Sequence, residues 1–230
     1  MQNIIKPSLE EIEKAIIVRD KKDAEIDRKN RIELVAAGLK MIQPKKVIKI
    51  DTGKVIGVPN VVNLIKKEIL KDDKIIAVEG ESGCGKSSTA EALSDNIGAI
   101  LFSMGEIFRY LTFVRLSDSS FEVNEELNSL EYRIIEDKLC LHKKSQNISH
   151  ELKSELNSHK IDLEVANTAT ESQYEVIKFM SGTIPKIARN SGKKIILEGR
   201  AFTLDFLPCD LRIILFADCK VRAERRMNER

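Results

Sequence analysis

The stretch KIIAVEGESGCGKSSTAEALSDNIG, residues 74–98, decides the fold class. It opens with a short apolar run, which is typical of a strand buried on both faces of a parallel sheet. The glycine-rich segment that follows, residues 80–87, fits the pattern G-x-x-x-x-G-K-[ST]. Helix-forming residues come next, and Gly98 is suited to end that helix in a left-handed conformation. A strand, a glycine loop and a helix in this order predict a P-loop.

The residue types of this loop fit a site for polyphosphate. Glycines let the backbone approach phosphate oxygens closely, and N–H groups at a helix start attract anions. Lys86 would place its ammonium against the β- and γ-phosphates, and the Ser87 hydroxyl would coordinate the Mg²⁺ that bridges them. We therefore predict that ATP with Mg²⁺ binds at Gly80, Glu81, Ser82, Gly83, Cys84, Gly85, Lys86, Ser87 and Ser88.

The rest of the chain predicts an α/β fold with an extension in front. Apolar runs at 194–198 and 211–216 alternate with helix-like stretches, so residues 74–230 predict a three-layer α/β/α P-loop NTPase fold around a parallel sheet. Residues 1–73 predict a mainly helical extension of unknown role. In it, Ser8 and Glu11 suggest a capping box before one or two charged helices, 45–51 suggests a strand, and 60–71 suggests an amphipathic helix. Its charges predict a solvated face or a surface for a protein partner.

The bulk composition argues against several classes of protein. Lys and Arg number 38 against 36 for Asp and Glu, so we expect no general nucleic-acid binding. The four cysteines form no C-x-x-C pair, and the three histidines complete no zinc-ligand spacing. No apolar run reaches about 18 residues, and no signal peptide is legible, so we expect a cytoplasmic protein that does not enter a membrane.

From Ile75 onward the sequence resembles the bacterial cytidylate kinases. Residues 75–113 are similar to that family's P-loop strand, first helix, second strand and D-[ST]-G-x-x-Y-R segment. The stretch LEYRIIEDKLCLHKKSQNISHELK, residues 130–153, is similar to the family's small β-rich insert for the acceptor nucleotide, which we expect at about 117–165. Residues 196–230, beginning ILEGRAF, resemble its D-G-R-D segment, fourth strand and the R-A-x-R-R opening of its lid.

The resemblance implies phosphoryl transfer from ATP with Mg²⁺ to a nucleoside monophosphate, (d)CMP or a related pyrimidine nucleotide. An arginine suits this chemistry because its planar guanidinium can contact two phosphate oxygens at once. The resemblance gives catalytic roles to Lys86, Arg200, Arg222 and Arg226, and Mg²⁺ contacts to Ser87 and, through water, Glu198. It implies acceptor binding by Gly105, Arg109, Thr170 and Arg200, and Asp205 could supply a further carboxylate there.

Three positions depart from the family pattern and leave the acceptor open. Met104, Phe108 and Ala201 stand where a hydroxyl residue, a tyrosine and an aspartate are usual. A kinase of another small acceptor is therefore one alternative. An ATP-binding regulatory protein with little turnover is another. A GTPase or a motor ATPase is disfavoured, because no N-K-x-D motif is present and no apolar run ends in Asp-Glu.

The resemblance also predicts missing elements behind the last residues. In the family, the segment RRMNER is followed by the rest of the lid, a further strand and a closing helix, and we expect these to be absent here. Two alternatives then stay open: the chain is a fragment or a truncated product, or residues 1–73 compensate, for instance by giving the strand KKVIKI to the sheet.

Overall fold

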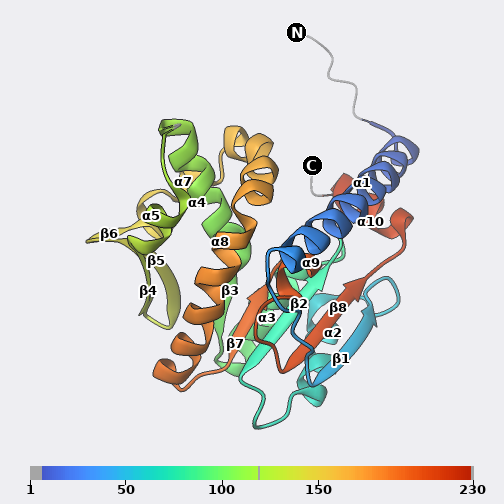
Figure 1. Cartoon of the computed structure of the whole chain (residues 1–230). Helices are drawn as coiled ribbons and strands as arrows, with labels where there is room; N and C mark the ends of the chain where they lie inside the picture. Colours follow the sequence, from blue (N-terminus) through green and yellow to red (C-terminus); the bar gives the residue numbers. More distant parts are fainter. Residues whose placement is uncertain (1–6, 119, 229–230) are drawn as a thin grey trace.

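The centre of the molecule is a five-stranded parallel sheet (Figure 1). A computed structural model describes residues 7–118 and 120–228 of the chain. The strand order is β1-β8-β2-β7-β3. The strands are β1 (Lys46–Asp51), β2 (Ile75–Gly80), β3 (Ile100–Ser103), β7 (Ile195–Glu198) and β8 (Leu211–Phe216). The predicted α/β fold is confirmed, and each apolar run that suggested a strand forms one.

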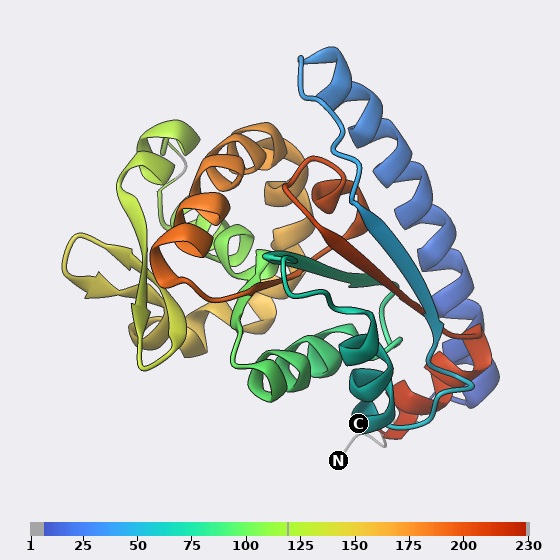
Figure 2. The same cartoon turned by 90° about the horizontal axis from the view of Figure 1, so that it is seen from below.

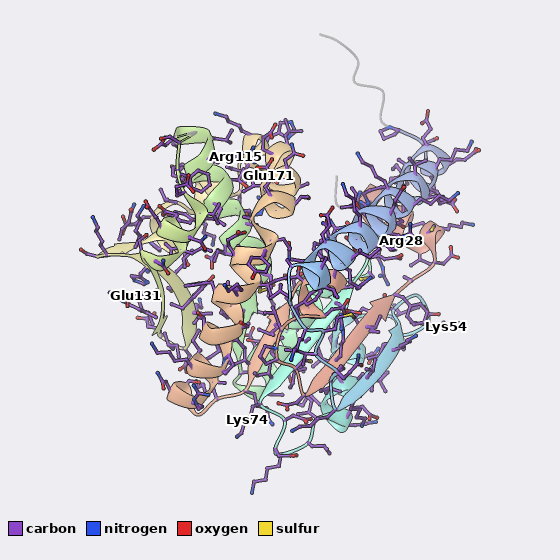
Figure 3. The ribbon with its side chains drawn as sticks, in the orientation of Figure 1. Arg28, Lys54, Lys74, Arg115, Glu131 and Glu171 are labelled. Atoms are coloured by element: carbon purple, nitrogen blue, oxygen red, sulfur yellow. The ribbon has the colours of Figure 1, made fainter. Side chains whose placement is uncertain are left out.

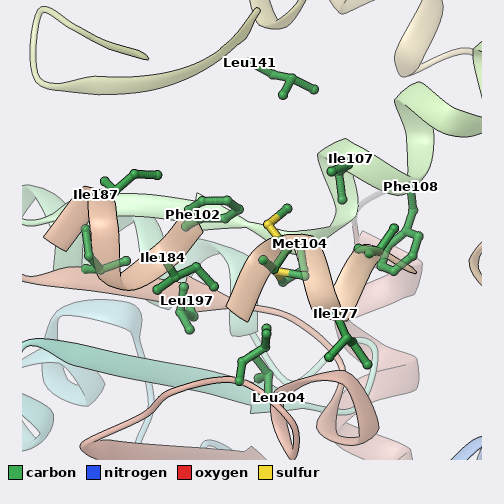
Figure 4. Close-up of a cluster of buried hydrophobic side chains, with 14 of the residues drawn as sticks. Phe102, Met104, Ile107, Phe108, Leu141, Ile177, Ile184, Ile187, Leu197 and Leu204 are labelled. Atoms are coloured by element: carbon green, nitrogen blue, oxygen red, sulfur yellow. The ribbon is translucent and has the colours of Figure 1, made fainter. Parts of the chain in front are cut away.

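Helices cover both faces of the sheet, which explains why its strands are almost continuously apolar. Helices α4 (Met104–Ser117) and α8 (His159–Ser191) pack on one face, where residues such as Phe102 and Ile184 are buried (Figure 4). Helices α2 (Val58–Glu68) and α3 (Lys86–Ile97) pack on the other, against residues such as Val78 and Ile213. Successive residues of one strand therefore enter two different cores, and three layers result.

A smaller antiparallel sheet stands apart from the central one, beside α4 and α8 (Figure 1). It consists of β4 (Leu130–Ile135), β5 (Lys138–Lys143) and β6 (Gln146–Asn147). Three short helices, α5 (Val123–Asn128), α6 (Ile148–Glu151) and α7 (Lys153–Leu156), flank it. These elements occupy the stretch in which the β-rich insert was predicted. Among the helices in the described ranges, none combines the length and the apolar character that a membrane crossing requires.

The N-terminal segment is part of the same body. Helix α1 (Leu9–Ala36) is one continuous helix, and the expected capping box between Ser8 and Glu11 opens it. It lies along α9 (Ala201–Leu204) and α10 (Cys219–Asn228), as Figure 2 shows. Strand β1 pairs with β8 in parallel, and places Ile48 opposite Ile213. The segment KKVIKI therefore contributes a strand to the sheet, which was one of the two alternatives that the sequence left open.

Candidate active site

The P-loop leaves β2 and enters α3 through backbone conformations that require glycine. Gly80 has φ of +153°, and a Cβ there would meet the Leu215 carbonyl oxygen at 2.3 Å. Gly85 caps α3 in the left-handed region, and no side chain caps that helix start. The first N–H groups of a helix lack partners within the helix, so this terminus is available to an anion. The concave turn between strand and helix is the geometry that the motif predicts.

Four polar side chains meet above the loop. The Lys86 ammonium lies 2.6 Å from the Glu198 carboxylate, which ends β7. The hydroxyl of Ser87 donates to the same carboxylate at 3.2 Å, and that of Ser103 donates to its other oxygen at 3.0 Å. Glu198 is almost fully buried. It therefore lies where the sequence predicted, at the end of a buried strand and directly beside Lys86.

The donor set suits Mg²⁺ held mainly by water and substrate. Mg²⁺ prefers oxygen ligands, and in phosphotransfer sites it is bound by one or two protein groups together with phosphate oxygens. Ser87 and Glu198 supply a hydroxyl and a carboxylate at hydrogen-bond distance from each other. Within residues 7–118 and 120–228, no group of three or more His, Cys, Asp or Glu side chains could hold a metal ion. The residues therefore fit an ion that arrives with the nucleotide.

An open cavity of about 1020 Å³ lies over the P-loop at the carboxyl ends of β1, β2 and β8. This is the edge at which ligands of open parallel sheets bind. The loop residues Gly80–Ser88 line it, together with Arg200, Arg225 and Arg226. Much of the remaining wall comes from the N-terminal segment, namely Asp20, Asp23, Ala24 and Asp27 of α1, Thr52, and residues 55–58. A volume of this order accommodates a nucleotide.

Three arginines of α10 lie near the P-loop: Arg225 and Arg226 line the cavity, whereas Arg222 does not. Arg226 lines the cavity and is hydrogen bonded to the Ser82 hydroxyl. Arg222 is 2% exposed and is turned away, with its guanidinium bonded to the Ala217 and Ser82 carbonyl oxygens and to Asp20. Arg225, which the sequence analysis missed, lines the cavity and donates to the Gly83 carbonyl oxygen at 3.2 Å. Its spacing of three residues from Arg222 marks it as a neighbour on the helix surface, but the spacing does not say which of these arginines faces the cavity.

The predicted acceptor residues are placed in different surroundings. Arg200 lines the cavity. Arg109 on α4 instead donates to the Leu156 carbonyl oxygen at 2.7 Å and to Asp162 at 2.6 Å, which joins it to the insert. Thr170 is exposed on α8, and Gly105 lies in the first turn of α4. The structure therefore brings only Arg200 of this set to the cavity wall.

Asp205 lies in a buried ion-pair network. It accepts from Arg212 at 2.6 Å and from Arg31 at 2.7 Å, and it is not among the residues that line the cavity. Arg212 in turn donates to Glu79 at 2.8 Å. Burial raises the pKa of Glu79 in spite of Arg212. The positive charges of Arg31 and Arg212 thus neutralise the negative charges of Glu79 and Asp205 in this network.

The positions that depart from the family pattern do not all face the cavity. Met104 and Phe108 are buried in the core between α4 and α8 (Figure 4). Met104 packs so closely that a Cβ at Gly199 would lie 3.1 Å from its side chain. Ala201 does line the cavity. Two of the three departures are therefore adaptations of the core.

Cys84 of the P-loop is a buried thiol with a raised pKa. It is fully buried, and burial raises its pKa, although the nearby Lys86 counteracts part of that effect. The thiolate is the reactive form of cysteine, so a raised pKa disfavours chemistry at this position. Its sulfur instead fills the space beside Gly80, where an added Cβ would approach it to 2.6 Å.

Comparison with known proteins identifies the class to which this fold and site belong. Residues 76–230 match the family model described as cytidylate kinase, and the chain belongs to that family. It is 32% identical over 162 residues to a cytidylate kinase of Borrelia hermsii, with 68% of this chain and 72% of the relative covered. It is 31% identical over 160 residues to that of Lactococcus lactis subsp. lactis, with 67% and 69% covered.

A third relative matches over a similar share of both chains. The cytidylate kinase of Mesomycoplasma hyopneumoniae is 28% identical over 162 residues, with 67% of this chain and 66% of the relative covered. The chain thus spans about two thirds of the length of the curated relatives that it matches.

Proposed function

We propose that this protein transfers the γ-phosphoryl group of ATP to a nucleoside monophosphate, with (d)CMP or a related pyrimidine nucleotide as the acceptor. The observation that carries the proposal is that Lys86 and Ser87, which line a nucleotide-sized cavity, meet Glu198 beside a helix start that has no side-chain cap. Membership of the cytidylate kinase family supports the reaction class. We also propose that the protein works in the cytoplasm.

The chain's own residues account for the main requirements of this reaction. Phosphoryl transfer needs alignment and neutralisation of charge more than covalent participation by the protein. The P-loop N–H groups and Lys86 bind the donor phosphates, and Ser87 and, through water, Glu198 would hold the Mg²⁺ that would supply further positive charge there. Arg200 and Arg226 face the same cavity and neutralise charge on the group in transfer. We therefore propose direct in-line transfer, without a covalent enzyme intermediate.

In the described structure the phosphate-binding cations are already paired with carboxylates. Lys86 pairs with Glu198 at 2.6 Å, Arg200 with Asp27 at 3.2 Å, and Arg109 with Asp162 at 2.6 Å. Phosphate oxygens would replace these partners as each substrate binds. Such pairing keeps the cations oriented before substrate arrives, which reduces the ordering that binding requires.

The experiment that tests this function is a coupled assay of ADP release. ATP and Mg²⁺ are supplied with CMP, dCMP, UMP, AMP or GMP in turn. We expect release to be stimulated at least about tenfold by one pyrimidine monophosphate, because the correct acceptor completes the aligned pair of substrates. Stimulation only by a different small phosphate or alcohol would change the acceptor assignment. Tight ATP binding without stimulation by any acceptor would instead identify a regulatory nucleotide-binding protein.

Arg109 offers a test of the acceptor side alone. We expect Arg109→Ala to raise the KM for the acceptor about 10- to 100-fold, because a charge-assisted hydrogen bond to phosphate is worth about 1.5–3 kcal/mol. The dissociation constant of ATP should stay within about twofold of the unmodified protein, since donor and acceptor phosphates bind to different residues. The measurement is steady-state kinetics beside ATP titration.

Arg115→Ala is the matched control for this variant. Arg115 lies on the same helix, and its ion pair with Glu171 likewise joins α4 to α8 (Figure 3). If Arg115→Ala removes this comparable ion pair and leaves the KM for the acceptor unchanged, the raised KM of Arg109→Ala is due to the loss of a phosphate contact. Equal changes in the two variants would contradict the role of Arg109.

A further inference from the structure

We propose that residues 7–73 are an integral part of the kinase domain, and that Asp20 in α1 is a positioning residue that holds the P-loop through Arg222. The first half of this inference concerns folding and needs no activity. The second half rests on the proposed function only in that the P-loop binds ATP.

The central sheet is the first reason to assign the segment to the domain. Strand β1 pairs with β8 along its whole length, from Lys46 opposite Leu211 to Asp51 opposite Phe216. Without β1, the strand β8 would present an unpaired edge to solvent. Helix α2 then buries Val61, Val62 and Ile65 in the core that also holds β2 and β8. The segment thus provides one edge strand of the central sheet and covers part of one of its faces.

Helix α1 extends this continuity to the other end of the chain. Ile12 and Ile16, in its first turns, pack with Ala223 of α10, whereas Leu34 near its end enters the main core. The first helix thus lies beside the last helix that the structure describes (Figure 2).

A chain of contacts leads from α1 to the phosphate loop. The Asp20 carboxylate accepts from the Arg222 guanidinium at 2.6 Å. Arg222 also donates to the Ser82 carbonyl oxygen at 3.4 Å, and Gly83 lies so close that an added Cβ would be 3.3 Å from the Arg222 Cβ. Burial would raise the pKa of Asp20, but hydrogen bonds from Arg222 and Arg19 outweigh it and lower the pKa. Asp20 is thus a charged anchor for the arginine that supports the loop.

The same helix touches the site at a second point. Asp23 and Asp27, one and two turns further along α1, lie 3.3 Å and 3.2 Å from the Arg200 guanidinium. Both carboxylates line the cavity. One face of α1 therefore contacts both Arg222 and Arg200. This is expected if α1 is a functional part of the site.

The domain assignment is tested by cutting the full chain between its first and second parts. A protease recognition sequence is inserted between Lys71 and Asp72, which are both exposed in the short turn before β2. After cleavage we expect the two pieces to stay together in gel filtration, to unfold in one transition, and to bind ATP within about twofold of the uncut protein.

Each outcome of the cleavage decides the proposal. Separation that leaves the piece from Asp72 onward soluble and able to bind ATP would overturn it, as would two separate unfolding transitions. Separation with loss of solubility or of ATP binding would support it. In that case β8 would have lost its partner strand β1, and the cavity would have lost the part of its lining that α1 contributes.

The positioning role is tested with Asp20→Asn, using Glu25→Gln on the exposed face of the same helix as the control. We expect Asp20→Asn to weaken ATP binding about tenfold in the folded protein, and Glu25→Gln to leave it unchanged. Arg222→Lys should show a similar loss, and the double variant should lose little more than Arg222→Lys alone, because Asp20 acts on the loop through Arg222.

An unchanged ATP affinity in folded Asp20→Asn, or additive losses in the double variant, would refute the positioning role. These readouts need no turnover. A protein that binds ATP but phosphorylates no acceptor would therefore fail the proposed function while leaving this inference open to the same measurements.

Discussion

Replacing Lys86 with alanine is expected to weaken ATP binding about 100-fold, which corresponds to about 2.7 kcal/mol. The ammonium faces the cavity and is 2.6 Å from Glu198, so it is positioned before the nucleotide arrives. A charge-assisted contact to phosphate is among the strongest single interactions available to a binding site. Isothermal titration with ATP and Mg²⁺ measures the effect, and acceptor-stimulated ADP release should be lost in parallel.

The fold should survive this substitution. Glu198 keeps the hydroxyl donors Ser87 and Ser103 at 3.2 and 3.0 Å, so its charge is not left without partners. Lys54→Ala serves as the control, because Lys54 projects from the surface after β1 (Figure 3). ATP affinity that is unchanged in a folded Lys86→Ala protein would refute the phosphate site itself, and with it the proposed kinase activity.

Replacing Arg212 with methionine is expected to destabilise the folded protein by about 3–5 kcal/mol. Arg212 is 8% exposed, and it donates to Glu79 at 2.8 Å and to Asp205 at 2.6 Å. Without it, Arg31 alone would balance two buried carboxylates. Removal of one partner from a buried ion pair is costly because the remaining charge keeps its desolvation penalty. Urea unfolding at neutral pH measures the loss.

The loss should depend on pH in a direction that follows from the charges. In the variant, Glu79 would have a folded-state pKa raised further above its unfolded value, so stability falls as pH rises through that value. The destabilisation should therefore be smaller near pH 5 than near pH 8. Arg115→Met, which removes an exposed ion pair, should cost less than about 1 kcal/mol. A loss that is small and independent of pH in Arg212→Met would contradict the network.

The sequence by itself determined the strands, the P-loop and the family. A short apolar run, a glycine loop and a helix start are local features, and their geometry follows from neighbouring residues. The sequence could therefore predict a phosphate site at Lys86, Ser87 and the loop glycines without a structure. Glu198 was placed correctly because the carboxyl ends of adjacent parallel strands meet at one edge of a sheet.

Only the tertiary structure decided how the N-terminal segment and the arginines are used. The pairing of β1 with β8 joins residues that are more than 160 positions apart, and no local pattern specifies such a partner. The same holds for Asp20 with Arg222. Whether an arginine faces the cavity, like Arg225, or supports the loop from behind, like Arg222, depends on the rotation of α10 against α1. Long-range packing sets that rotation, and spacing along the chain does not.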